Sequence, residues 1–268
     1  MPKILLREED VMQTLLEKTR EINKLLQRSG KIGCAELVKV LRDVIVSNIY
    51  IVSNEGHVRG YALINDFECD IMKSQVLDKS YFPKNYTKWL ADCHTTLPNV
   101  ELQDRMCAFK NDTKCIFDGK YTTIVPIYGG GERLATLILA KFNVPFNEED
   151  LILSEYAATV IGIEILHNRT VKIEEAAHRR AMVQIAFSTL SYSELEAIIN
   201  IIGALEGNEG LLVASKIADQ AGITRSVIVN ALRKFESAGL IETRSLGMKG
   251  TYIKLLNEFL LDELKKKK

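Results

Sequence analysis

The hydrophobic and polar positions of the N-terminal part follow two different repeats, one typical of helices and one typical of strands. Apolar residues recur three and four positions apart over Thr14–Gln27 and Ala35–Val46, which predicts two amphipathic helices. The segments Asn48–Ser53 and Val58–Ile64 are instead rich in β-branched and aromatic residues, and the turn residues Asn54–Gly56 separate them. This pattern predicts a β-hairpin after the two helices.

The next segment is irregular before strand patterns return. Short helices are predicted between Phe67 and Leu97, and strands over Met106–Lys110, Tyr121–Ile127 and Leu134–Phe142. The glycines at 129–131 lack the lysine and the following helix of a phosphate-binding loop, so they predict a hairpin turn. Two helices, an antiparallel sheet and an insertion over one face predict an α+β sensor domain of the GAF or PAS type. Such a domain would hold a small ligand between the sheet and the insertion.

The longest helical stretch begins after Asn147, with Asp150 in the capping-box position three residues on. Gly162 is the one Gly or Pro before about Phe187. The first half is densely apolar, whereas Arg169–Arg180 is mostly charged. We therefore expect the first half to pack on the sensor domain and the second half to be a solvated connector. This helix would transmit a ligand-dependent state and help to form a dimer, or it would be a rigid spacer.

The segment Leu211–Leu256 has the pattern of a winged helix-turn-helix. Helical spacing ends at Gly222, and Thr224 stands at the N-cap position of a second amphipathic helix. Two short β-rich pieces follow, Ile241–Arg244 and Thr251–Leu255, joined by a turn that contains glycine and lysine. These are the parts of a DNA-binding domain whose second helix enters the major groove.

The candidate DNA contacts are small, hydroxyl, amide and cationic residues on both helices and on the wing. They are Ala214, Ser215, Lys216, Thr224, Arg225, Ser226, Asn230, Arg233, Lys234, Arg244 and Lys249. Arginine and asparagine can bond to guanine and adenine edges, and free N–H groups at the start of the first helix can bind a phosphate. Seven Lys or Arg and three acids lie between residues 215 and 254, whereas residues 194–213 hold four acids and no base. This sorting favours DNA over a winged helix used only for protein contacts.

Composition narrows the remaining possibilities. The 268 residues suffice for about two domains, and the chain is formally neutral. The N-terminus lacks the apolar core of a signal peptide, and no apolar run approaches about 18 residues, so a cytoplasmic protein without membrane association is expected. Five cysteines without a CxxC pair and four histidines give no metal-ligand spacing. No catalytic constellation stands out either, so we predict no metal site and no enzyme activity.

Four segments carry a resemblance to a known family. They are LLEKTREINKLLQ (Leu15–Gln27), TTIVPIYGGGERLATLIL (Thr122–Leu139), LSYSELEAI (Leu190–Ile198) and the stretch Ala214–Lys254. In these segments the chain resembles the CodY family of nutrient-responsive transcriptional regulators. Residues 1–13 look like an extension before the family's usual start. The resemblance implies a GAF-like sensing domain over residues 1–147, a long linker helix over 148–189 and a winged helix-turn-helix domain over 190–268.

The resemblance also implies ligands and partners. CodY proteins act as dimers on double-stranded operator DNA, mainly as repressors, and they bind isoleucine, leucine or valine in the GAF domain. Many also respond to GTP, and no other cofactor is implied. The expected function is therefore a global regulator whose operator affinity is raised by branched-chain amino acids. The alternatives are an N-terminal domain that is a dimerisation scaffold or binds another small effector, and an enzyme or nucleotide-binding protein with an appended DNA-binding domain.

The family's ligand-binding positions can be carried over residue by residue. The positions for the amino acid are Ile71, Met72, Val76, Phe82, Pro83, Tyr86, Cys107 and Phe109, and those for GTP are Ser53, Glu164 and Arg169. Ile71 replaces the family's arginine that pairs with the ligand carboxylate, so backbone amides or another cation must take over, or the affinity or the ligand differs. One extra residue separates Met72 from Phe82. The segment Ser53–His57 has lost the cations that a triphosphate favours, which makes amino-acid sensing the stronger expectation.

Overall fold

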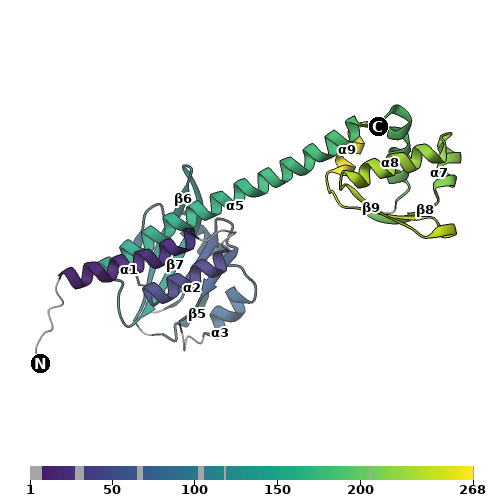
Figure 1. Ribbon diagram of the computed structural model, residues 1–268. Helices are drawn as coiled ribbons and strands as arrows, with labels where there is room; N and C mark the ends of the chain where they lie inside the picture. The colour runs from purple at the N-terminus through teal and green to yellow at the C-terminus, as the bar shows by residue number, and fades with distance from the viewer. Residues whose placement is uncertain are drawn as a thin grey trace, which may run out of the picture. The chain divides into compact units, whose positions relative to one another are not determined.

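The computed structural model describes residues 8–27, 33–64, 69–101, 106–117, 119–205 and 207–267. The chain divides into two compact units, residues 1–169 and 170–268, each with a hydrophobic core of its own. One helix, α5 (Glu148–Ser188), contributes its first part to the N-terminal unit and its last part to the C-terminal unit (Figure 1). The predicted α+β class, with a long helix between a sheet-containing part and a helix-turn-helix part, is confirmed.

An antiparallel sheet of five strands forms the centre of the N-terminal unit. Its strands, in the spatial order β2-β1-β7-β6-β3, are β1 (Asn48–Ser53), β2 (Val58–Ala62), β3 (Leu97–Val100), β6 (Lys120–Gly129) and β7 (Glu132–Phe142). Both predicted hairpins, β1–β2 and β6–β7, are present. Their turns need positive φ values, which Gly56 supplies in the first (99°) and Gly130 and Gly131 in the second (60° and 81°). The run at 129–131 is therefore the expected hairpin turn.

The side chains of the sheet alternate between its two faces, as the repeat of two residues in a strand requires. Ile51 points to the face that is covered by α1 (Glu8–Leu26), α2 (Cys34–Ile45) and the first part of α5. Its neighbour Val52 belongs to a separate cluster on the opposite face. Since both faces are covered, β1 is buried along its whole length.

The segment between β2 and β6 covers the second face. Its elements are α3 (Asp70–Met72), the π-helix η1 (Lys73–Leu77), α4 (Lys84–Ala91), β4 (Met106–Cys107) and β5 (Lys110–Lys114). Short helices were predicted here from Phe67 on, and those that begin at Asp70 are confirmed, whereas residues 67 and 68 lie outside the described ranges.

Three details of the N-terminal prediction are wrong. Helix α1 begins at Glu8, six residues before the start predicted at Thr14. Strand β3 was not predicted; it begins at Leu97, the last residue of the region expected to hold short helices, and its Pro98 is tolerated because β3 lies at the edge of the sheet. A turn at Ala108 and Phe109 interrupts the strand expected over Met106–Lys110, so the chain reverses and pairs as β4 and β5.

The C-terminal unit contains the predicted helix-turn-helix and wing. Its elements are α6 (Tyr192–Gly203), β8 (Glu209–Leu212), α7 (Ala214–Ala221), α8 (Arg225–Ser237), β9 (Ile241–Ser245), the 3-10 turn η3 (Gly247–Lys249), β10 (Thr251–Leu255) and α9 (Leu260–Lys267). The sheet order is β8-β10-β9. Strand β8 and helix α9 were not predicted from the sequence. Leu260 and Leu264 of α9 are buried in the core of this unit.

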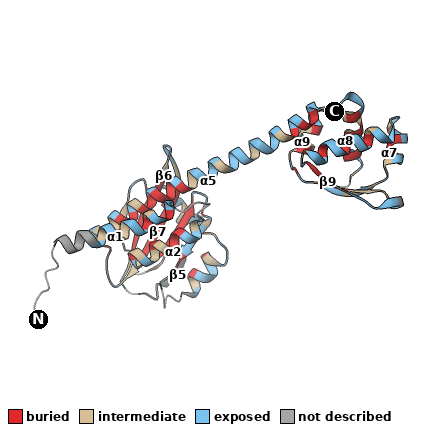
Figure 2. Ribbon diagram, viewed as in Figure 1, coloured by how far each residue is buried: buried red, intermediate tan, exposed pale blue. Residues whose placement is uncertain are grey.

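The capping box predicted at the start of α5 is present. Asn147 Oδ1 accepts a hydrogen bond from the Asp150 backbone N–H (2.8 Å), and Asp150 Oδ2 accepts one from the Asn147 N–H (3.1 Å). Lys141 Nζ also donates to Asp150 Oδ2 (2.6 Å), which ties the end of β7 to the start of the helix. Nearly all side chains over residues 169–180 are exposed, as their charge predicts (Figure 2).

Candidate effector cavity and DNA-binding surface

A cavity lies between the second face of the N-terminal sheet and the segment that covers it. It has about 50 Å³ of free volume. Small-molecule sites usually span about 300–1,000 Å³, so a ligand would have to displace lining side chains to enter. Strands β1, β6 and β7 form its base, and α3, α4 and the β4–β5 hairpin lie around it. Its lining residues are Asn48, Tyr50, Cys69, Met72, Phe82, Tyr86, Cys107, Ala108, Phe109, Cys115, Phe117, Lys120, Thr122, Ile138, Ala140 and Phe142.

Aromatic rings form much of the lining. Phe82 stacks on Tyr86 with 5.5 Å between ring centroids, and Phe109 lies 5.8 Å from Phe82 and 5.4 Å from Tyr86. Tyr50 meets Phe82 edge to face at 6.1 Å. Burial raises the pKa of the Tyr50 and Tyr86 phenols above the ordinary tyrosine value, so both remain neutral. This part of the cavity therefore offers a rigid, uncharged surface to an apolar side chain.

A few polar groups interrupt the apolar lining. Asn48 is fully buried, and its Oδ1 accepts a hydrogen bond from the Ile64 backbone N–H (2.8 Å). Its Nδ2 is buried without a hydrogen-bond partner within the part of the chain that the structure describes. Lys120 lies at the start of β6, with Nζ 5.8 Å from the centroid of the Phe109 ring. Thr122 follows on the same face of the strand.

The structure brings five of the eight residues predicted to bind an amino acid into this cavity. These five are Met72, Phe82, Tyr86, Cys107 and Phe109. The other three lie nearby without lining it. Ile71 is half-buried in α3, Val76 is fully buried in the cluster that includes Phe82, and Pro83 is the N-cap residue of α4. Ile71 thus does not line the cavity.

The residues that the sheet contributes were missed by the sequence reading. Asn48 and Tyr50 are two positions apart on β1, so they face the same side. The register places Ala140 of β7 opposite Asn48 on one neighbouring strand and opposite Thr122 on the other. The alternation of side chains within the predicted strands shows which residues share a face. Only the pairing register shows which residues of neighbouring strands lie beside one another.

The residues predicted to bind GTP have different surroundings. Ser53 is buried at the end of β1, where its Oγ accepts a hydrogen bond from the His57 N–H (3.2 Å). Glu164 is nearly buried on α5, and its Oε2 has no hydrogen-bond partner among the described residues. Arg169 is exposed and pairs with Glu132 at 3.1 Å. These contacts do not assemble the clustered positive charge that binds a triphosphate.

Helices α7 and α8 form the helix-turn-helix. Gly222 ends α7 in the left-handed conformation (φ 65°), and α8 begins after Thr224. Thr224 has the extended backbone of an N-cap residue, but its side chain makes no capping hydrogen bond. Instead, Thr224 Oγ1 lies 2.8 Å from Ser226 Oγ, so the two hydroxyls pair at the exposed start of α8.

Helix α8 has one buried face and one exposed face (Figure 2). Its buried residues are Ile228, Ala231, Leu232 and Phe235, and its exposed ones include Arg225, Ser226, Val229, Asn230 and Arg233. Neither Arg225 nor Arg233 forms an ion pair with another described residue. The predicted reading residues of α8 therefore form one continuous, accessible surface whose guanidinium groups are available to a ligand.

Lys234 forms hydrogen bonds and an ion pair with other residues of its own unit. Its Nζ donates to Glu194 Oε2 (2.7 Å) and to the Thr189 carbonyl (2.9 Å). Glu194 also forms a capping box with Ser191 at the start of α6. The Lys234 and Ser191 contacts hold the pKa of the Glu194 carboxyl below its ordinary value. Lys234 thereby ties α8 to α6 and helps to fix the position of the reading helix.

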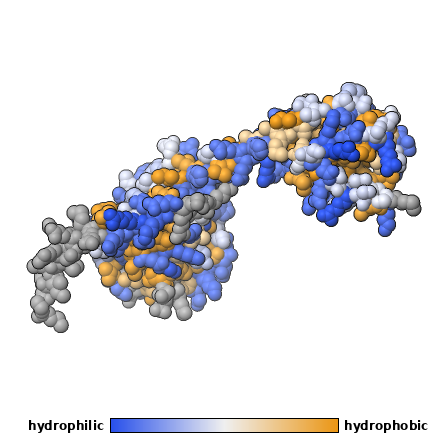
Figure 3. Space-filling model, in the orientation of Figure 1, coloured by the Kyte–Doolittle hydropathy of each residue, from blue (hydrophilic) through white to orange (hydrophobic). Residues whose placement is uncertain are grey.

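The wing and the start of α7 supply the remaining candidates. Lys249 is exposed in the turn between β9 and β10, and Ser215 and Lys216 are exposed at the start of α7, where Ala214 is half-buried. Arg244 on β9 pairs with Glu242 (2.8 Å). Figure 3 shows hydrophilic residues over much of the visible face of this unit.

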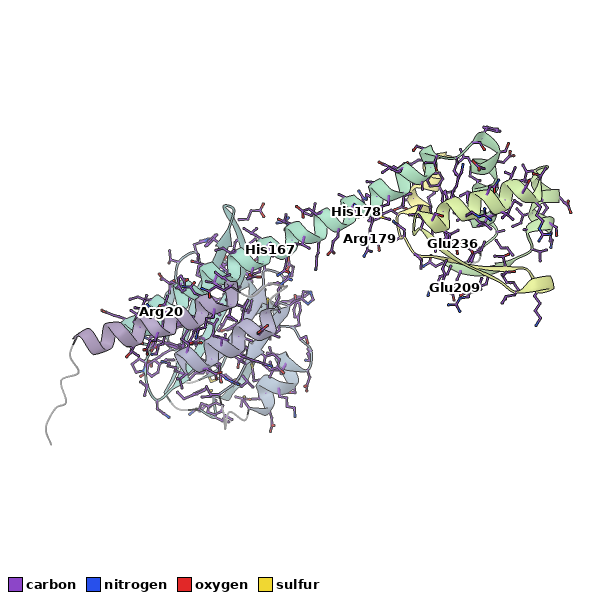
Figure 4. All side chains as sticks on the ribbon, in the orientation of Figure 1. Arg20, His167, His178, Arg179, Glu209 and Glu236 are labelled. Atoms are coloured by element: carbon purple, nitrogen blue, oxygen red, sulfur yellow. The ribbon has the colours of Figure 1, made fainter. Side chains whose placement is uncertain are left out.

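Hydrogen bonds hold the wing against α8. Glu236, labelled in Figure 4, accepts hydrogen bonds from the Thr243 N–H (3.0 Å) and Oγ1 (2.8 Å). These bonds join the end of α8 to β9, so the wing has a defined position relative to the reading helix.

No group of three or more His, Cys, Asp or Glu residues in the described ranges could hold a metal ion. No helix in the part of the chain that the structure describes is long and apolar enough to cross a membrane.

Comparisons with known proteins identify two family domains in the chain. Residues 14–189 match the model of the CodY GAF-like domain, and residues 208–268 match that of the CodY helix-turn-helix domain. The global transcriptional regulators CodY of Clostridium kluyveri and Clostridium perfringens are each 54% identical over 257 residues, which is 95% of this chain and 99% of theirs. The cofactor-binding GAF domain of the nutrient sensor CodY from Clostridium difficile is 34% identical, covering 56% of this chain and 97% of that one, with a TM-score of 0.41.

Proposed function

Because the chain belongs to the CodY family of global transcriptional regulators, we propose that it is a DNA-binding regulator, mainly a repressor, that senses a branched-chain amino acid. The observation that supports the sensing role most directly is the cavity on the second face of the sheet. Its aromatic and aliphatic lining suits a branched side chain, and its few polar groups suit the backbone of a free amino acid. Each buried methylene adds about 0.8 kcal/mol to the binding free energy.

The output of the regulator is the exposed surface of α8 with the wing beside it. Arg225, Ser226 and Asn230 would read base edges in the major groove, while Arg233, Lys249 and the start of α7 would contact phosphates. We leave Lys234 out of the direct contacts because it bonds to Glu194 and Thr189.

The protein is proposed to act as a homodimer on a two-fold symmetric operator. Among the apolar side chains exposed on the helices of the N-terminal unit, three would be covered by a second copy. They are Leu16 of α1 and Ile152 and Ile163 of α5. GTP is proposed as a weaker candidate effector, because Ser53, Glu164 and Arg169 supply a single cation that already pairs with Glu132.

The experiment that tests this function is an operator titration with and without amino acid. The operator is first selected by the protein from a random DNA pool, and gel shifts then give the affinity and the number of chains per operator. Isoleucine at millimolar concentration should raise operator affinity by about 5- to 150-fold, the usual range of coupling between sites. Alanine should have little effect, because it lacks three carbons of the side chain and loses about 2 kcal/mol of burial.

Unchanged operator affinity with isoleucine would contradict the sensing role while leaving DNA binding intact. An equal response to isoleucine and alanine would show that the cavity does not select the side chain.

A further inference from the structure

We infer that Lys120 and Asn48 form the site that binds the carboxylate of the effector. This inference rests on the proposed function, since it assigns the polar end of a ligand whose apolar end lies against the aromatic rings. It also says how this chain binds a carboxylate although Ile71 offers no charge and does not line the cavity.

The charge of the lining favours an anionic group. Among the described residues that line the cavity, Lys120 is the one cation, and none of them is Asp or Glu. The ammonium therefore has no carboxylate of the protein beside it in the lining. Its contact there is the ring of Phe109, a cation–π arrangement with 5.8 Å between Nζ and the ring centroid. An anion that enters the cavity would meet a positive charge that no carboxylate of the described lining neutralises.

The second group is the Asn48 amide. Asn48 is fully buried, its Oδ1 is held by the Ile64 N–H, and its Nδ2 has no hydrogen-bond partner in the described structure. Because Oδ1 is already engaged, the amide is oriented and offers its N–H groups as donors. Buried donors in folded proteins are almost always paired, so an unpaired one that lines a cavity indicates an acceptor that belongs to the ligand.

The sheet register places the two groups on the two strands that flank β7. Asn48 on β1 lies opposite Ala140 on β7, and Ala140 lies opposite Thr122 on β6. Lys120 precedes Thr122 by two positions, faces the same side of the sheet and lies opposite Phe142. Two strand spacings, about 10 Å at the backbone, separate Asn48 from Thr122, and Lys120 lies two residues further along β6. A carboxylate above Ala140 would contact both groups when the long lysine side chain extends past Phe142 toward it.

The test compares two ligands that differ only at the carboxylate. L-isoleucine carries it, whereas L-isoleucinol has an alcohol in its place and keeps the same side chain and amine. Both are titrated calorimetrically into the full-length protein, its Lys120→Met variant, and Lys114→Met as a control that removes an exposed lysine of β5 outside the lining. A fourth protein, Asn48→Asp, keeps the acceptor for the Ile64 N–H and removes the donor. Thermal melting confirms that each variant is folded.

The wild type and the Lys114→Met control should bind isoleucine about 10- to 100-fold more tightly than isoleucinol, as expected for a charge-assisted contact. Lys120→Met should lose this preference by weakening isoleucine alone, and Asn48→Asp should reduce it in the same direction. If folded Lys120→Met keeps the wild-type preference, the carboxylate assignment is overturned while amino-acid sensing stands. If the wild type binds neither ligand, the proposed sensing function fails, and the assignment fails with it.

Discussion

Replacing Arg225 by alanine should lower the affinity for operator DNA by about 10- to 100-fold, the effect of losing one bidentate contact to a base. Arg225 is the first residue of α8, at the end of the helix that enters the major groove in this class of domain. Its side chain is exposed and forms no ion pair with the described part of the protein. The substitution should therefore leave the fold intact and remove only an intermolecular contact.

The measurement is a pair of binding curves, one with the selected operator and one with a scrambled duplex of the same length. Arg225→Ala should weaken operator binding much more than binding to the scrambled DNA, because a base contact carries sequence information and a phosphate contact does not. Lys265→Ala is the matched control, since it removes one exposed cation from α9 in the same unit. An equal loss on both duplexes would reassign Arg225 to a phosphate, and no loss on either would contradict the proposed surface.

Replacing Gly162 by alanine should destabilise the N-terminal unit by about 2–3 kcal/mol, the usual cost of overpacking a rigid site. Gly162 lies within α5, and a Cβ at this position would stand 2.5 Å from the carbonyl oxygen of Tyr128 at the end of β6. That oxygen belongs to the backbone of a paired strand, so it cannot move as a flexible side chain could. Either α5 shifts away from the sheet or the β6–β7 hairpin bends.

Denaturant unfolding followed by tryptophan fluorescence isolates this effect, because the single tryptophan, Trp89, lies in α4 of the N-terminal unit. A loss of this size corresponds to a fall in Tm of about 4–12 °C for a unit of this length. Gly33→Ala is the control in the same unit, since a Cβ there would lie 4.0 Å from its nearest neighbour, the Ala35 N, and the φ of Gly33 is −82°. That variant should change the free energy of unfolding far less than Gly162→Ala does. Wild-type stability of Gly162→Ala would show that α5 does not press on the sheet as closely as described.

Much of the fold could be predicted because local pattern and tertiary packing agree. Strand β1 has the predicted bounds, Asn48–Ser53, since its β-rich run is buried on both faces. The start of α5 could be predicted from Asn147 and Asp150 because a capping box is a local interaction. The elements that were not predicted are those whose structure depends on contacts with residues distant in the sequence. Strand β8 has four residues and is a strand because β10 pairs with it, and α9 is held by contacts of Leu260 and Leu264 with the core.

The same difference between local and distant signals applies to the candidate site. The aromatic part of the lining, Phe82, Tyr86 and Phe109, could be identified by resemblance because it lies in a recognisable stretch of sequence. The polar part could not, because Asn48 and Lys120 lie on strands more than seventy residues apart in the chain and meet only through the register of β1, β7 and β6. Neither residue type is unusual in a strand, so nothing local marks them.

The central claim is that occupation of the cavity and binding of operator DNA are linked, and linkage is reciprocal. The most direct test is to titrate isoleucine calorimetrically into the full-length protein alone and into its complex with saturating operator. The account predicts that the operator tightens isoleucine binding by the same factor by which isoleucine tightens operator binding in gel shifts. Identical isoleucine affinities in the presence and absence of operator would contradict it, because the two sites would then be independent.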